Sequence, residues 1–164
     1  MTCVHEAARE FRNPVSGERI VIRESGARNG GRLLSFDLFL PPGGHVPAGH
    51  VHPGQEERFT VVAGRMRFRL GRRTVVAGPG ETVVVPPGTA HWFGCDGQGP
   101  AHASVEVRPA LRMEELFERT AASRGLPDLA RVVLDFPREI AVPHVPGVVA
   151  RAVLAPLALI GRRR

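Results

Sequence analysis

The chain has 164 residues, of which 43% are hydrophobic, and this size and composition suit one globular domain with a core of its own. Its formal charge is +6, but half of that excess comes from the three arginines that end the chain. Because no basic helix or aromatic stacking motif accompanies the arginines, no nucleic-acid partner is expected.

Most of the chain consists of short apolar segments separated by turns. Residues 1–18 show weak periodicity and are expected to form an N-terminal arm. From residue 19 on, apolar and polar residues alternate, and many of the 19 glycines and 15 prolines fall between the segments. This pattern predicts a β-sandwich or barrel over residues 19–109. Its expected strands are 19–24, 33–40, 46–52, 56–63, 65–70, 74–77, 81–85, 91–95 and 101–108.

Residues 110–164 form a different kind of segment, because the apolar period changes there from two to about 3.6. One helix is expected to end at Gly125, a second to run from Asp128 to Phe136, and a third over 148–160. The apolar surface of the third helix is too extensive to leave in water, so the helical extension is expected to pack on the barrel or across a dimer interface. The inward faces of the first two helices are Met113, Leu116, Phe117, Thr120 and Ala121, and Leu129, Val132, Val133 and Phe136.

Two histidines stand close together in the third predicted strand. His50 and His52 are two residues apart, so both side chains point to the same face. Glu57 is five residues beyond His52, a spacing that on an unbroken strand would place it on the opposite face. A type II turn at Pro53-Gly54 resolves this, because proline suits its second position and glycine its third. The following strand then brings Glu57 beside the two histidines.

Alternation also selects Glu57 over its neighbour Glu56. Glu57 shares a face with the apolar residues Phe59 and Val61, which are expected to point inward. Gly64 permits the next tight reversal of the chain. The carboxylate that joins the histidines is therefore Glu57.

A later stretch supplies a third histidine. A turn at residues 86–88, Pro-Pro-Gly, leads into a strand on which His91, Phe93 and Cys95 share one face. Three imidazoles and one carboxylate form a ligand set for a divalent transition metal, and Fe, Mn, Ni, Cu and Zn all remain open.

These two stretches resemble the two sequence motifs of the cupin superfamily. The first motif is glycine, five residues, His-x-His, three or four residues, glutamate, six residues and glycine. The second is glycine, five residues, Pro-x-Gly, two residues, histidine, three residues and asparagine, but Cys95 stands here in place of the asparagine. The matching residues are Gly44, His50, His52, Glu57 and Gly64, and Gly80, Pro86, Gly88 and His91.

The resemblance implies an all-β fold, a double-stranded β-helix (jelly-roll) barrel, with the helical extension as a C-terminal appendage. It implies a metal inside the barrel, held by His50, His52, Glu57 and His91, and it implies a homodimer. The departure at Cys95 leaves these ligands intact and affects only the local hydrogen bonding.

Within the superfamily the chain is most similar to the small single-domain group that includes quercetin-dioxygenase-like enzymes and polyketide cyclases. We therefore expect a metal-dependent oxygenase for a small hydrophobic or aromatic substrate, with Glu57 as metal ligand and general base. The alternatives are a metal-dependent cyclase or isomerase, and a non-catalytic cupin that binds a small molecule. The expected substrate-pocket residues are Phe59, Val61, Met66, Phe68, Phe93 and Cys95.

Other charged or titratable side chains are expected outside the pocket. His45 lies in a glycine-rich loop and is expected in solvent, and His102 belongs to a polar stripe that is solvated, faces an interface or lines the pocket. Alternation places Arg65, Arg67 and Arg69 on the face opposite the pocket.

Cysteine usage and hydropathy indicate in which cellular compartment the protein is expected. Cys3 lies near a terminus and Cys95 in a core strand, so no disulfide is expected and a reducing cytoplasm is the default. No apolar signal segment follows Met1. The longest apolar stretch is interrupted by Arg151 and is too short to span a bilayer, so no membrane partner is expected.

Overall fold

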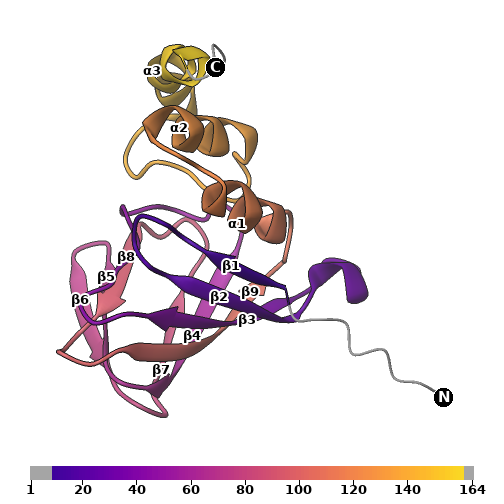
Figure 1. Ribbon diagram of the computed structural model, residues 1–164. Coiled ribbons are helices and arrows are strands. Elements are labelled where there is room, and N and C mark those ends of the chain that lie inside the picture. The colour runs from indigo at the N-terminus through magenta and orange to yellow at the C-terminus, as the bar shows by residue number, and fades with distance from the viewer. Residues whose placement is uncertain (1–8, 161–164) are drawn as a thin grey trace.

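Two antiparallel β-sheets enclose the interior of the domain, and three helices are stacked over one end (Figure 1). The computed structural model describes residues 9–160. One sheet has the strand order β1-β2-β3-β9-β4-β7 and the other β6-β5-β8. The strands are β1 (Glu10–Arg12), β2 (Arg19–Glu24), β3 (Leu34–Leu40), β4 (Glu56–Ala63), β5 (Met66–Leu70), β6 (Arg73–Ala77), β7 (Thr82–Val85), β8 (His91–Cys95) and β9 (Ala101–Arg108).

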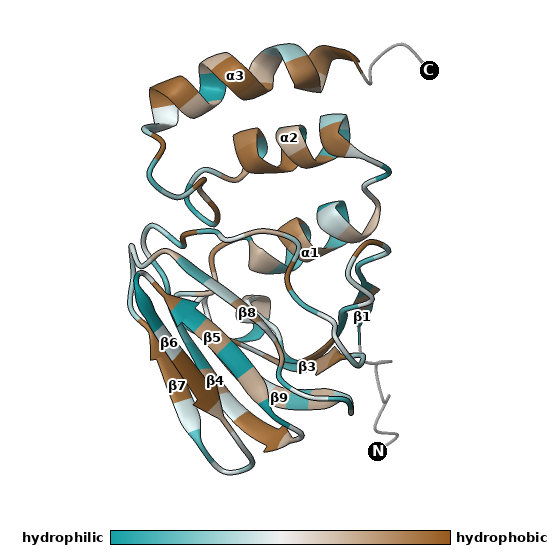
Figure 2. Cartoon of the chain, turned by 90° about the vertical axis from the view of Figure 1, so that its left-hand side faces the viewer, coloured by the Kyte–Doolittle hydropathy of each residue, from teal (hydrophilic) through white to brown (hydrophobic). Residues whose placement is uncertain are grey.

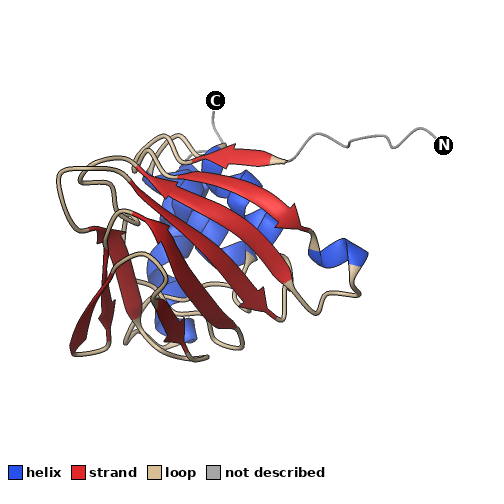
Figure 3. Cartoon of the chain, turned by 90° about the horizontal axis from the view of Figure 1, so that it is seen from below, coloured by secondary structure: helices blue, strands red, loops and turns tan. Residues whose placement is uncertain are grey.

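Figure 3 shows the two sheets from below, with the helices behind them. Eight of the nine expected strands are present with nearly the expected bounds, because each is a short alternating run closed by a turn. The all-β double-stranded β-helix with a C-terminal helical appendage is confirmed.

The expected strand over residues 46–52 is not a regular strand. This segment follows β8 through isolated bridges only, which pair His45 with Gly94 and His50 with His91. Its proline has no N–H to donate, so a continuous ladder of hydrogen bonds is not formed. The segment still lies along the edge of the smaller sheet, which keeps its histidines beside β8.

The larger sheet begins earlier in the chain than expected. The prediction of an arm over residues 1–18 is wrong for its described part, because β1 pairs antiparallel with β2. Three residues are too few to show a period, but Phe11 packs against Phe117 of the first helix, with ring centroids 6.3 Å apart. This contact holds the short strand on the sheet.

The helices are α1 (Met113–Ala121), α2 (Leu126–Asp135) and α3 (Gly147–Ile160). Figure 2 shows α1 nearest the barrel, α2 above it and α3 farthest away. α2 starts before the expected N-cap at Asp128, because Pro127 lies in its first turn, where a missing N–H costs nothing. Gly125 caps α2 and separates it from α1.

The third helix packs on α2 and not on the barrel. Of the two expected placements, packing on the barrel is therefore not found for α3, packing across a dimer interface stays a prediction, and much of the apolar surface of α3 is exposed within the single chain. The exposed residues are Val148, Val149, Val153, Leu157, Leu159 and Ile160. Within residues 9–160, no helix has both the length and the apolar character needed to cross a membrane.

Candidate metal centre

The four side chains expected to bind a metal converge at the helix-covered end of the barrel. His50 and His52 come from the loop between β3 and β4, Glu57 from β4, and His91 from the start of β8. One ligand atom from each lies within 4.8 Å of the other three. His52, Glu57 and His91 are buried, whereas His50 is partly accessible at the edge.

Backbone hydrogen bonds join the two loops that carry the histidines. The N–H of His50 donates to the carbonyl of His91, and the N–H of His91 donates back, both at 2.9 Å. The N–H of Gly88 donates to the carbonyl of His52 at 2.8 Å. Gly88 has a φ of +75°, a conformation that favours glycine, so this turn holds the two motifs together.

The chain turns at Pro53-Gly54, as expected, but not in the expected type. Gly54 is not among the glycines with positive φ, which a type II turn requires at that position. The next residue explains how the chain is held instead. Gln55 is fully buried, and its Nε2 donates to the carbonyl of Pro109 at 2.9 Å. This contact anchors the start of β4 and sets Glu57 on the inner face.

Hydrogen bonds to backbone carbonyls orient all three imidazoles. A carbonyl only accepts, so each Nδ1 carries the proton and each Nε2 keeps its lone pair. Support of this kind is typical of histidine ligands to metals. The three pairs are His50 with Ala48 at 3.1 Å, His52 with Glu139 at 2.5 Å, and His91 with Thr89 at 3.0 Å.

Three ligand atoms in the centre are buried without a hydrogen-bond partner. They are Nε2 of His52, Nε2 of His91 and Oε2 of Glu57. The carboxylate oxygen lies 3.4 Å from the first nitrogen and 3.2 Å from the second. Leaving a buried polar atom unpaired costs about 1–3 kcal/mol, and a cation between these atoms would accept all three lone pairs. The residues present therefore fit a divalent transition metal.

The charges of the apo centre are strongly coupled. Burial lowers the pKa of His50 to about 3, with help from His52 and His91, so His50 is neutral at physiological pH. Burial by itself would raise the pKa of Glu57, but the two buried histidines outweigh it and the pKa is lowered. For His52, burial would lower the pKa, but Glu57 outweighs it and the pKa is raised. The raised pKa of His52 means that the centre attracts a proton, and a metal cation would take the place of that proton.

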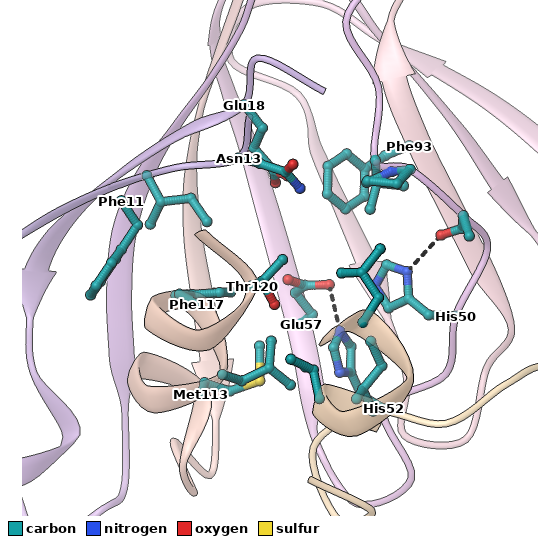
Figure 4. A pocket seen from close by; sticks show the side chains of 18 of the residues that line it. Phe11, Asn13, Glu18, His50, His52, Glu57, Phe93, Met113, Phe117 and Thr120 are labelled. Atoms are coloured by element: carbon teal, nitrogen blue, oxygen red, sulfur yellow. Dashed lines mark hydrogen bonds and ion pairs between the residues drawn. The ribbon is translucent and has the colours of Figure 1, made fainter. Parts of the chain in front are cut away.

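A cavity of about 290 Å³ lies between the barrel and the helices and reaches the centre (Figure 4). His50, His52 and Glu57 form part of its wall, and most of the remaining wall is apolar. A cavity of this size and character is typical of a site for a small molecule. The predicted inward faces of α1 and α2 line it, with Phe136 as the exception, so these helices cap the barrel.

The family follows from the sequence comparison. A protein-family model described as a cupin domain matches residues 37–107, which contain all four candidate ligands. Residues 37–107 of this chain therefore form a cupin domain. No curated protein matches the chain at the level required for significance.

Solved cupin structures resemble this cupin in fold. An RmlC-like cupin from Shewanella frigidimarina has 16% identity, with 67% of this chain and 91% of that chain covered and a TM-score of 0.56. A predicted oxalate decarboxylase from Thermotoga maritima has 18% identity, covers 66% and 96%, and scores 0.54. A sugar phosphate isomerase of the cupin superfamily from Silicibacter pomeroyi has 19% identity, covers 62% and 71%, and scores 0.54. At such identities the likeness shows the fold alone.

Of the expected pocket residues, Phe59 and Phe93 line the cavity, with ring centroids 5.0 Å apart. The prediction is wrong for Val61, Met66 and Phe68. These three are at most 1% exposed and belong to the packed core of the cupin barrel, with Phe68 5.1 Å from Phe59 between ring centroids. Alternation predicts the face of a strand correctly, but not the depth at which the cavity ends.

Cys95 is also absent from the cavity wall, so its expected place there is wrong. Its thiol donates to the carbonyl of Gly99 at 2.9 Å. Cys95 lies at the opposite end of β8 from His91, and four residues of extended strand carry it away from the centre. The thiol acts at the strand end, where the family's asparagine was expected to provide hydrogen bonding.

The remaining side chains lie outside the cavity, as most were expected to. His45, Arg65, Arg67 and Arg69 are exposed. His102 pairs with Asp37 at 3.1 Å and stacks on Phe39, with ring centroids 4.3 Å apart. None of these residues lines the cavity.

Sequence reasoning missed several residues of the site, both apolar and polar, and the polar ones bear on its chemistry. Asn13 and Glu18 line the cavity from the segment taken for an arm, and the carbonyl of Glu139 supports His52 from beyond α2. A signal for Glu18 was present, because it lies two residues before Ile20 and so shares its inward face. For Glu139 no local pattern gave a signal, since it acts through its backbone.

Proposed function

We propose that this cupin is a metal-dependent enzyme that acts on a small, largely apolar molecule, and that oxygenation is its reaction. One observation carries the proposal. The orphaned ligand atoms of His52, His91 and Glu57 gather where the centre meets an apolar cavity. A purely structural metal site is closed by its ligands, whereas a catalytic one keeps access for a substrate.

Each part of the site has a role in this proposal. His50, His52, Glu57 and His91 would hold the metal, which when bound supplies a Lewis-acid cation and, if redox-active, electrons for O₂. The apolar wall excludes water and favours a hydrophobic or aromatic substrate. The backbone carbonyls keep the imidazoles oriented whether or not substrate is present.

Glu57 is also our candidate for the general base. Its carboxylate lines the cavity, and its lowered pKa keeps it ionised. As a base, this carboxylate would need one oxygen that the metal does not hold, so that the oxygen can accept the substrate proton.

A cyclase or isomerase is the second candidate, and a specific observation favours it. Glu18 is a second carboxyl group in the same cavity, and such reactions move protons without O₂. A non-catalytic binding protein would use the same cavity but turn over no substrate.

Metal analysis tests the proposal. Wild-type protein, expressed in metal-replete medium and purified without chelator, is expected to carry about one equivalent of metal, and His50→Ala is expected to lose it. His102→Ala is a matched control, because His102 pairs with Asp37 outside the cavity. Fe, Mn, Ni or Cu would favour oxygenation, whereas Zn would favour cyclisation or isomerisation, since Zn has no redox chemistry. A metal-free wild type would contradict the proposal.

A further inference from the structure

The connection between β1 and β2 directs a carboxyl group into the cavity. The N–H of Asn13 donates to the carbonyl of Glu18 at 2.8 Å, and the N–H of Gly17 donates to the carbonyl of Asn13 at 3.0 Å. These two bonds fix the backbone of the turn. Glu18 then shares the inner face with Ile20, and both side chains line the cavity.

The Glu18 carboxyl group has few partners for a buried acid. Glu18 is 8% exposed, and its carboxyl group has only uncharged partners: the hydroxyl of Ser16 donates to it over a long 3.5 Å, and the side chain of Asn13 also forms a hydrogen bond with it. Within residues 9–160, no arginine or histidine forms an ion pair with it. The neighbouring Arg19 turns away and pairs instead with Glu10 at 3.3 Å. A buried carboxyl group without a cation is costly to the fold when ionised, which points to a role beyond packing.

The cavity places this group with the metal centre. Its titratable wall residues are Glu18, Glu57, His50 and His52, and no arginine lines it. Figure 4 shows Glu18 beside Asn13, across the cavity from His52, with Glu57 between them. A ligand in the cavity therefore has the centre on one side and Glu18 on another.

The surroundings of Glu18 bring its pKa close to neutral pH. Burial raises its pKa to about 7, and the negative charge of Glu57 adds to the effect. Burial is the larger cause and does not depend on whether a metal neutralises Glu57. A group with such a pKa is able both to give and to take a proton at physiological pH.

Building on the proposed function, we propose that Glu18 is a second acid–base residue of the site and takes a proton from a ligand hydroxyl group in the cavity. The O–H bond of the ligand breaks, an O–H bond forms on the Glu18 carboxylate, and the ligand oxygen keeps the electron pair. That oxygen then faces the centre as an anion. The substrate class is thus a small, mostly apolar molecule with an acidic hydroxyl group, such as a phenol or an enol.

Proton counting tests this role without the natural substrate. The probe is catechol, a small aromatic ring with hydroxyl groups that bind metals, and the protein is loaded with redox-inert Zn(II). Calorimetric titration in buffers of different ionisation enthalpy measures the protons released on binding. At about pH 8, wild type is expected to release about one proton fewer than Glu18→Gln, because Glu18 retains it. At about pH 5.5 the two counts are expected to agree, since Glu18 is already protonated.

The outcomes separate this inference from the proposed function. Equal proton counts at both pH values, with zinc and catechol bound to both proteins, would overturn the role of Glu18 and leave the metal site intact. Failure of catechol to bind the zinc-loaded wild type would overturn it as well. A wild type without zinc would overturn the proposed function itself. Glu118→Gln, on the exposed side of α1, is the matched control and is expected to behave as wild type.

A measurement on the wild type alone guards against poor folding of the variant. At about pH 8, infrared difference spectra on addition of catechol are expected to show a new band from a protonated carboxyl group. Absence of that band would contradict the transfer of a proton to Glu18.

Discussion

Replacing Glu18 with glutamine is expected to change how the stability of the protein depends on pH. The folded state raises the pKa of Glu18 from 4.5 to about 7, so between these values the folded protein holds a proton that the unfolded chain releases. The free energy of unfolding contributed by Glu18 is therefore highest below pH 4.5 and falls as pH rises through 7. Glu18→Gln removes this dependence, because the amide does not titrate.

The magnitude follows from the size of the shift. Each pKa unit corresponds to 1.36 kcal/mol, so a rise from 4.5 to about 7 amounts to about 3 kcal/mol. Relative to Glu18→Gln, the wild type is expected to lose roughly this much unfolding free energy between pH 4 and pH 8. Because Glu18 is buried, solvent screening reduces the value little.

Urea denaturation measures the effect. Wild type and Glu18→Gln are compared at several pH values with a chelator present, so that both proteins are metal-free and the other titrating groups cancel in the difference. Glu118→Gln is again the control, since its carboxyl group is exposed. Parallel stability curves for wild type and Glu18→Gln across pH 4 to 8 would refute the reasoning, because they would mean that Glu18 titrates as it does in the unfolded chain.

Three further predictions concern the centre, a turn and the outer helix. Glu57→Gln keeps the shape of the side chain but removes its charge, so we expect the affinity for zinc to fall by more than about 10-fold. A competition titration with a chelator measures this affinity, and an unchanged value would exclude Glu57 as a ligand. Gly64→Ala is expected to cost more than about 2 kcal/mol in urea denaturation, because Gly64 has a φ of +73° and its added Cβ would lie 2.3 Å from the carbonyl oxygen of Pro100. Gly71→Ala, where φ is +58° but the space is open, should cost less, and equal losses would argue against the clash. We predict that the wild type is a homodimer formed through the apolar surface of α3, and that Val153→Glu, at a position 60% exposed on this surface, is a monomer in light scattering; an unchanged mass would contradict this interface.

The sequence by itself determined eight of the nine strands and the four candidate metal ligands. Alternation and turn residues act over a few neighbouring positions, so they show that Glu57 and not Glu56 faces inward and that His91 begins a strand. The inward faces of α1 and α2 follow in the same way from a period of 3.6. These inferences need no knowledge of how distant segments meet.

Only the tertiary structure decided where the cavity ends and what reaches it. Val61 and Phe59 lie on the same face of β4, yet Val61 packs in the core and Phe59 lines the cavity. The depth at which the cavity ends depends on how side chains from the opposite strands and the helices fill the barrel. Glu18 shares the inward face of Ile20, but only the folded chain shows that this face borders the cavity, and Glu139 acts through a backbone carbonyl that no side-chain pattern reveals. Both reach the centre because residues far apart in the chain pack together, which is a property of the folded state and not of any local run of residues.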